Sequence, residues 1–196
     1  MVMEVERTAR RVLEVEFNGG LNTDYSTIEE GLINEPTFAA LIPVPDGYKR
    51  YILEIDHLGL LDGDFLRMQT GFDDEDPLAF EQGVKAYQYQ GYYYFGSGTG
   101  SSFGTPFGPT NGDYGIKVTT PINNAPSTRG VIRWSNQKDA AGPTVFECSF
   151  SGWRGFLNTQ FTTGVCHGQT ARVANLKIFC EYSTIRHLRY SLLGKR

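Results

Sequence analysis

The sequence predicts an all-β protein, an antiparallel β-sandwich of the jelly-roll type that contains one short N-terminal helix at most. Three observations carry this prediction. The 196 residues include 23 Gly and 9 Pro. Gly and Pro together make up roughly 12% of average chains, and their higher share here indicates many turns. Aromatic residues make up 13%, whereas disordered chains are poor in them. Helical periodicity is nearly absent, and short alternating runs recur at roughly regular spacing, as is typical of sandwiches and barrels.

Residues 1–35 are expected to form an N-terminal arm. Apolar and polar residues alternate over residues 7–18, which favours a strand. Residues 23–33 are the best candidate for a short helix, because Ser26 is placed to cap it and Glu29 follows three residues later in capping-box register. The arm therefore holds one strand and the single helix that the fold class allows.

Residues 36–196 are expected to form the β-sandwich itself, so that the whole chain makes one compact domain. Alternation over residues 48–58 puts Tyr51, Leu53 and Ile55 on one face. The next segment, residues 61–64, is expected to be a hairpin turn, because its Asp-Gly pair favours positive φ angles. Further strands are expected at residues 65–70, 84–95, 114–120, 130–135, 144–153, 156–165, 174–182 and 188–193, with a glycine-rich loop at residues 96–112.

Alternation in the last strands also assigns side chains to the core. Three sets of apolar residues fall on one face each: Phe146, Cys148 and Phe150; Leu176, Ile178, Cys180 and Tyr182; and Leu188, Tyr190 and Leu192.

Charge is distributed unevenly along the chain, whose net charge is −4. Residues 24–81 hold 14 acidic and 3 basic side chains, whereas residues 82–196 hold 4 acidic and 12 basic ones. Strand order can place the two halves beside each other in one fold, or the subunit can present acidic and basic faces that complement those of a neighbour. The acidic total argues against a nucleic-acid binder.

The three cysteines, Cys148, Cys166 and Cys180, have no C-x-x-C spacing, and their odd number argues against a disulfide framework. They are expected to be buried free thiols of a protein made in a reducing cytoplasm. No apolar segment near the N-terminus indicates a secretory signal. The uncharged residues 86–112 contain too many glycines and polar side chains for a membrane-spanning helix, so we expect no membrane partner.

Several degenerate motifs in residues 36–196 resemble a β-sandwich module of tailed-bacteriophage virion proteins. The motifs are Tyr48-x-x-Tyr51-x-Leu53-x-Ile55-x-x-Leu58, Asp62-Gly63-x-Phe65-Leu66-Arg67, Ala86-Tyr87-x-Tyr89, Gly130-Val131-Ile132, the loop around residues 164–168, and the closing run from Leu176-x-Ile178-Phe179 through Thr184-Ile185 to Arg189-Tyr190-x-Leu192-x-Gly194. The chain departs from the family at Thr70–Asp76, where a second glycine is missing, and at Leu193, where an aromatic residue is usual.

This resemblance implies where the protein works, in a phage virion, more than any chemical activity. Members of the family are components of tail fibres, head fibres, decoration proteins and baseplates. The resemblance therefore implies a structural virion protein, made in the host cytoplasm, that assembles with copies of itself, a trimer being one option, and with other virion proteins. The alternative is a receptor- or glycan-binding module of the virion that contacts a host surface glycan.

No motif in the sequence indicates catalysis, so we expect neither enzyme activity nor a cofactor. Three carboxylates in an acidic run, Asp73, Asp74 and Asp76, are weak candidates for Ca²⁺ ligands, because clustered oxygens suit a hard cation. A solvated hairpin loop is the preferred explanation of the same run. The three histidines, at positions 57, 167 and 187, lack zinc-site spacing.

Surplus aromatic residues are the candidates for an interface. Tyr92 and Tyr94 fall on the opposite face of their strand from Tyr87 and Tyr89, where amphipathic tyrosines suit a subunit contact or a glycan. In the glycine-rich loop, Phe103 and Phe107 are expected to anchor the loop on a neighbouring subunit. The alternative is that the loop folds back and caps its own sandwich.

Overall fold

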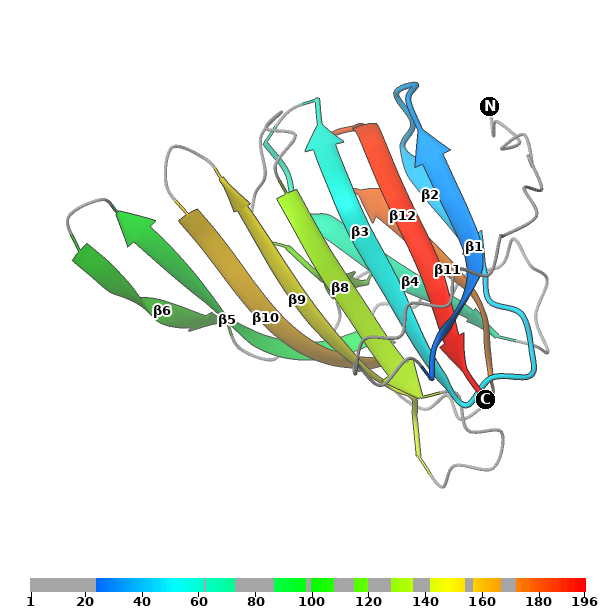
Figure 1. The fold of residues 1–196 in the computed structure, drawn as a ribbon. Coiled ribbons are helices and arrows are strands. Elements are labelled where there is room, and N and C mark those ends of the chain that lie inside the picture. Colours follow the sequence, from blue (N-terminus) through cyan, green and yellow to red (C-terminus); the bar gives the residue numbers. More distant parts are fainter. Residues whose placement is uncertain are drawn as a thin grey trace, which may run out of the picture.

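The structure, a computed structural model, describes residues 24–61, 63–72, 87–97, 100–107, 115–119, 128–135, 142–153, 157–166 and 172–196. These residues form twelve strands in two antiparallel sheets that pack against each other (Figure 1). The predicted class, an all-β antiparallel sandwich, is confirmed. The strand predicted within residues 7–18 and the proposed boundary at residue 35 concern an arm that lies mostly outside the described residues.

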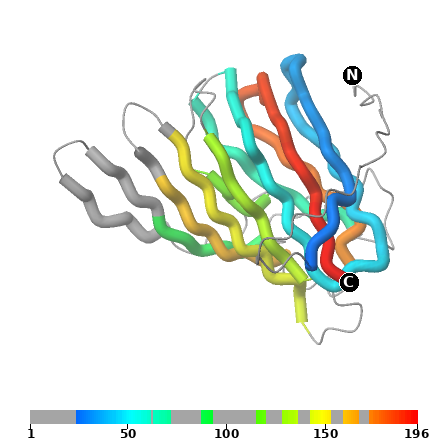
Figure 2. The backbone as a smooth tube through the Cα atoms, viewed as in Figure 1, coloured from blue at the N-terminus to red at the C-terminus, as the bar shows by residue number. Residues whose placement is uncertain are grey.

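The larger sheet has eight strands. In spatial order they are β1 (Ser26–Ile33), β12 (Ile185–Lys195), β3 (Arg50–Leu60), β8 (Thr128–Ser135), β9 (Val145–Trp153), β10 (Leu157–Cys166), β5 (Tyr87–Ser97) and β6 (Gly100–Phe107). The blue and red ends of the described chain lie side by side in this sheet, because β12 pairs with β1 (Figure 2).

The smaller sheet has four strands. In spatial order they are β2 (Ala39–Pro43), β11 (Val173–Cys180), β4 (Leu66–Phe72) and β7 (Ile116–Lys117). In both sheets a strand from the basic half of the sequence lies between strands from the acidic half: β12 between β1 and β3, and β11 between β2 and β4. Strand order therefore places acidic and basic segments side by side within one fold, the first of the two interpretations of the charge pattern.

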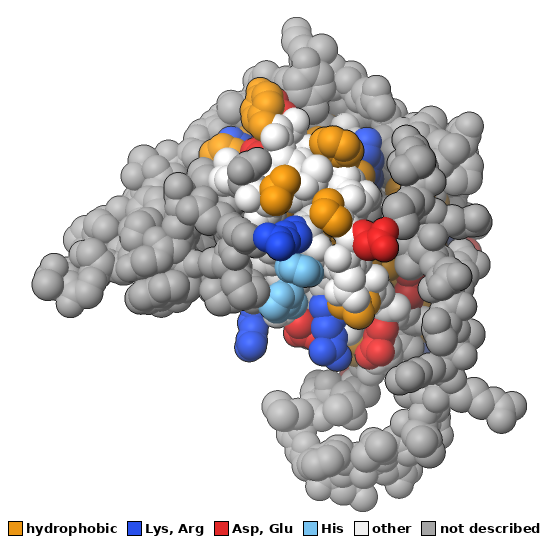
Figure 3. Space-filling view, turned by 90° about the horizontal axis from the view of Figure 1, so that it is seen from above, with side chains coloured by type: hydrophobic (Ala, Val, Ile, Leu, Met, Phe, Trp, Pro, Cys, Tyr) orange, Lys and Arg blue, Asp and Glu red, His pale blue; other side chains and the backbone are white. Residues whose placement is uncertain are grey.

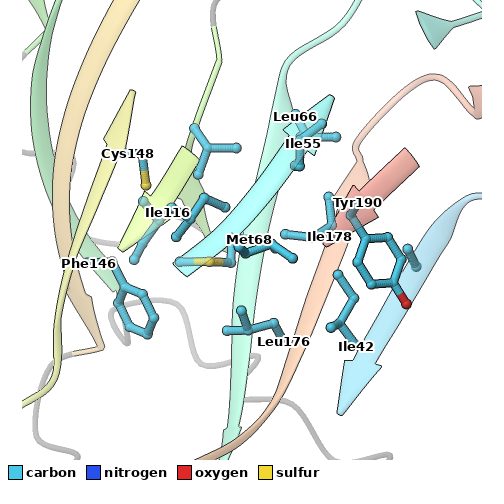
Figure 4. Packing of buried hydrophobic residues seen from close by; sticks show 14 of the residues in the cluster. Ile42, Ile55, Leu66, Met68, Ile116, Phe146, Cys148, Leu176, Ile178 and Tyr190 are labelled. Carbon is cyan, nitrogen blue, oxygen red and sulfur yellow. The ribbon is translucent and has the colours of Figure 1, made fainter. Parts of the chain in front are cut away.

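The core lies between the two sheets and is built by alternation. Side chains of the larger sheet, such as Ile55 and Tyr190, point towards side chains of the smaller sheet, such as Met68 and Ile178 (Figure 4). Each of these side chains is at most 4% exposed. The predicted inward sets of β3, β9 and β12 are all buried, as is the set of β11 up to Cys180. Tyr182 is an exception and is 82% exposed, because β11 ends two residues before it.

Two glycines of the larger sheet lie beneath aromatic rings of the neighbouring strand. Gly31 pairs with Tyr190, and Gly130 pairs with Phe150. A Cβ atom added to either glycine would collide with the ring opposite. The absence of a side chain is thus required by close approach, and the rings fill the space that it leaves on the inner face.

The helix predicted over residues 23–33 is wrong, because Ser26–Ile33 forms strand β1. Its backbone groups pair with β12, from Ser26 opposite Gly194 to Ile33 opposite Leu188. The Ser26 hydroxyl donates to the carbonyl of Gly194 (3.3 Å) instead of capping a helix. A ladder with a distant strand thus overrides a local capping signal.

Two predicted connections also differ from the structure. The segment at residues 61–64 is not a hairpin turn, because β3 and β4 belong to different sheets. The predicted loop at residues 96–112 contains strand β6, Gly100–Phe107, which pairs with β5. The prediction of an unstructured loop is wrong in that part, since β-ladder hydrogen bonds with β5 offset the weak strand propensity of its glycines.

Candidate interaction surface

Three connections between the sheets meet at one end of the sandwich, which we call the crossover end. They run from β1 to β2 (residues 34–38), from β3 to β4 (residues 61 and 63–65) and from β11 to β12 (residues 181–184). Backbone hydrogen bonds tie them together: the N–H of Ile185 donates to the carbonyl of Thr37 (2.7 Å), and that of Leu61 to the carbonyl of Thr184 (3.0 Å). The result is a platform drawn from distant parts of the sequence.

Buried and partly buried charges hold this platform. The carboxylate of Asp64, only 3% exposed, accepts hydrogen bonds from the backbone N–H groups of Phe65 and Tyr182, each at 2.7 Å. Next to it, the guanidinium of Arg67 donates to the carboxylate of Glu181 (2.6 Å). Hydrogen bonds to ionised groups are the stronger ones, so Asp64 fixes the β3–β4 connection against the β11–β12 turn.

Three large apolar side chains project from this platform. Phe38 is 74% exposed, Tyr182 82% and Leu61 49%, and we call these three residues the crossover patch. Their backbones are neighbours, because the N–H of Cys180 donates to the carbonyl of Phe38 (3.4 Å) and Leu61 binds the β11–β12 turn. Figure 3 looks down on this end of the molecule and shows hydrophobic side chains (orange) spread over it. A hydrogen bond to Glu181 raises the pKa of Tyr182.

Beside the patch, the outer face of the larger sheet carries a hollow of about 510 Å³, which we call the histidine hollow. It is lined by Leu32, Asn34, Asp56, His57, Arg129, His187 and Arg189. The rings of His57 and His187 lie edge to face with their centroids 6.0 Å apart. The two histidines (pale blue) lie next to Lys or Arg side chains (blue) in Figure 3.

A β-bulge in β3 builds this hollow. Two consecutive residues of β3, Asp56 and His57, stand opposite Arg129 alone on β8, and the register with β12 shifts at the same point. A bulge re-aims side chains that would otherwise alternate between faces. Asp56 and His57 therefore both line the hollow, together with Arg189, which pairs with His57 across the ladder.

A second feature of the outer face lies on β5 and β10. Tyr92 and Phe161 stand directly opposite each other, and each is about half exposed, at 54% and 49%. We call them the outer aromatic pair. The prediction that Tyr92 faces away from Tyr87 and Tyr89 is confirmed, since both of the latter are buried.

The other predicted site residues are not brought into this surface. Tyr94 lies in β5, and Phe103 and Phe107 lie in β6, but the positions of their side chains are outside what the structure describes. The candidate calcium ligands Asp73, Asp74 and Asp76, like His167, lie outside the described residues. Within the described residues, no three His, Cys, Asp or Glu side chains group in a way that could hold a metal ion.

The three thiols are buried and unbridged, as predicted. Burial raises the pKa of Cys148 far above its ordinary value near 9, and a nearby Glu147 acts in the same direction. Burial, with the negative charge of Asp64, raises the pKa of Cys180 to about 12. Thiols that stay protonated react slowly, so Cys148 and Cys180 contribute packing and not a nucleophile at neutral pH.

Sequence reasoning missed most of this surface. Phe38 and Leu61 fall where no periodicity assigns a face, and His57 and His187 are 130 positions apart in the numbering of the chain. The pairing of β12 with β3 is what brings the histidines together. The one usable signal was the position of these residues in the sequence. Phe38 and Leu61 lie next to turns, and turns usually lie on the surface of a protein.

Comparison of the chain with protein-family models, with curated proteins and with solved structures finds no match. In the part of the chain that the structure describes, no helix has the length and hydropathy needed to cross a membrane.

Proposed function

We propose that this chain is a structural subunit that works through subunit–subunit assembly, with the crossover patch as its contact surface. One observation carries the proposal: Phe38, Leu61 and Tyr182 are exposed together on a platform held by backbone hydrogen bonds and by Asp64. Exposed apolar groups of this size are costly on a free surface, and aromatic side chains are enriched at interfaces. A rigid platform also lowers the entropy lost when the surface is covered.

The occupant that we propose is a second copy of the same chain. Both signs of charge border the patch: Glu35 is exposed within the crossover end, and Arg186 is exposed at the start of β12. In a contact related by a two-fold axis, the acidic side of one copy meets the basic side of the other. Charges placed in this way favour self-association and fix its orientation.

The biological setting that we propose is the virion of a tailed bacteriophage, in a tail, fibre or capsid-decoration position, with other virion proteins as further partners. The proposal of this setting is supported by the sequence resemblance over residues 36–196.

Self-association tests this function directly. Replacing Phe38 and Tyr182 together by Ser should shift the sedimentation profile of the purified chain from oligomer to monomer while leaving its thermal midpoint within a few degrees of the wild type. The matched control is Phe161→Ser. This substitution removes a half-exposed aromatic side chain that lies on β10 of the larger sheet, outside the crossover patch. A wild-type chain that remains monomeric at high concentration, or an oligomer that survives the double substitution, contradicts the proposal.

The second candidate function is glycan binding, and the outer aromatic pair favours it. Two adjacent half-exposed rings on one sheet face form a platform of the kind on which sugar rings stack. Tyr92→Ser should then abolish retention on immobilised host-surface polysaccharide without changing the oligomeric state. Retention that is lost with the crossover-patch variant and kept with Tyr92→Ser would assign recognition to the assembled patch instead.

A further inference from the structure

We propose that the histidine hollow is a binding site for an oxyanion, a carboxylate, sulfate or phosphate group held by Arg129 and Arg189. This inference is independent of the proposed assembly function. The proposed assembly contact does not use the side chains that line this hollow.

The position of the basic groups is the first argument. Three adjacent strands contribute to the hollow: Arg129 comes from β8, Arg189 from β12, and the bulge of β3 lies between them. Both arginines are exposed. Within the described residues, neither forms an ion pair with Asp56, the carboxylate that lines the same hollow. The two arginines therefore lie on the strands on either side of the bulge, and each guanidinium carries the forked pair of N–H donors that suits a carboxylate, sulfate or phosphate group.

The balance of charge is the second argument. The titratable and charged groups that face the hollow are Asp56 and His57 from β3, Arg129 from β8, and His187 and Arg189 from β12, while β1 adds the uncharged Leu32 and Asn34. Two guanidinium groups outweigh one carboxylate even when both imidazoles are neutral.

The size and lining of the hollow restrict the class of ligand. A volume of about 510 Å³ is more than a bare inorganic anion needs, so the hollow has room for part of the molecule that carries the anionic group. Asn34 supplies an amide that can donate to a further oxygen, and Leu32 supplies an apolar wall. These features suit an oxyanion on a small polar molecule, such as the carboxylate of an acidic sugar.

Sulfate is the best first probe, because its charge is fixed near neutral pH whereas the charge of phosphate changes there. Titration of the full chain with sodium sulfate, at an ionic strength held constant with sodium chloride, should shift the imidazole Cε1–H resonances of His57 and His187 in a saturable way. A parallel titration with acetate and with glucuronate distinguishes a site for a tetrahedral anion from one for a carboxylate on a sugar.

Variants identify the groups responsible. Arg189→Gln and Arg129→Gln should each weaken binding about five-fold or more, whereas Arg133→Gln, a matched change of an exposed arginine on β8 outside the hollow, should leave it unchanged. Asp56→Asn should strengthen binding, an outcome that loss of folding cannot mimic. Shifts that do not saturate, or that persist unchanged in both hollow variants, overturn the proposal.

Discussion

The two faces of the eight-stranded sheet follow different rules. On the inner face, Leu53, Ile55 and Tyr190 are almost completely buried, and glycines occur where a neighbouring ring needs space. On the outer face of the same sheet, Arg129 and Arg189 are exposed and line an open hollow. Packing therefore determines the inner residues, while the outer residues are free to serve recognition.

Truncation on the two faces should give the largest contrast in stability. Leu53 is fully buried and its neighbour in sequence, Ile52, is only half-buried on the outer face. Leu53→Ala should lower the free energy of unfolding by about 2–5 kcal/mol, because it leaves a cavity in the core. Ile52→Ala should cost about 1 kcal/mol or less, since solvent and mobile side chains fill the space.

Chemical denaturation of both variants measures this contrast. Equal losses for Leu53→Ala and Ile52→Ala would show that the outer face is covered in solution, for instance by a partner subunit, and would break the distinction between the faces.

Adding a methyl group should give a contrast of intermediate size, in which the inner-face variant loses stability and the outer-face variant keeps or gains it. Gly130→Ala puts a Cβ into the ring of Phe150 on the inner face and should cost about 1–3 kcal/mol through overpacking. Gly59→Ala puts one on the outer face, where the nearest atom, of His187, is 3.6 Å away. Because alanine loses less backbone entropy than glycine, Gly59→Ala should be neutral or stabilising by up to about 1 kcal/mol.

Thermal unfolding of the two glycine variants, measured side by side, decides the point. The distinction fails if Gly59→Ala is the more damaging substitution of the two.

The buried thiols should give the smallest effect, a dependence of stability on alkaline pH. Cys148 has a folded-state pKa raised above its ordinary value, so the folded protein keeps the proton that the unfolded chain releases. Stability is therefore complete below about pH 9 and falls as the pH rises further, by on the order of 1 kcal/mol for each such thiol at pH 10. Cys180, whose pKa burial raises to about 12, contributes with the same sign over the window from about 9 to 12.

Cys148→Ala and Cys180→Ala test this at constant denaturant. Each should cost about 1 kcal/mol or somewhat more at pH 7, the scale of a small core truncation, and should flatten the fall in stability between pH 8 and 10. An unchanged pH slope in both variants would falsify the burial of the thiols, as would rapid labelling of the native protein by a thiol reagent.

The local sequence pattern was enough to predict which side chains face the core, but not how the strands pair and connect. Alternation identified Phe146, Cys148 and Phe150 as buried, because a period of two is fixed by strand geometry alone. It could not show that Ser26–Ile33 is a strand, because that depends on pairing with β12 across most of the sequence. Likewise the Asp-Gly signal near Leu61 marks a change of direction but not whether the chain stays in the same sheet.

The candidate site was less predictable than the fold for the same reason. His57 and Arg189 become neighbours only through strand order, and Asp56 enters the hollow only through a bulge. No residue in either segment carries a signal for these events. By contrast, the exposure of Tyr92 followed directly from its alternation with Tyr87 and Tyr89.

The place of β12 between β1 and β3 has a consequence for biosynthesis. The hydrogen bond from the Tyr190 hydroxyl to the carboxylate of Glu29 (2.9 Å) joins residues 161 positions apart, and the ladder around it is equally long-range. While the ribosome is still translating the residues before β12, the gap between β1 and β3 stays unfilled and two strand edges stay open. Such edges invite pairing with other chains. The larger sheet can therefore close only after residue 195 has left the ribosome.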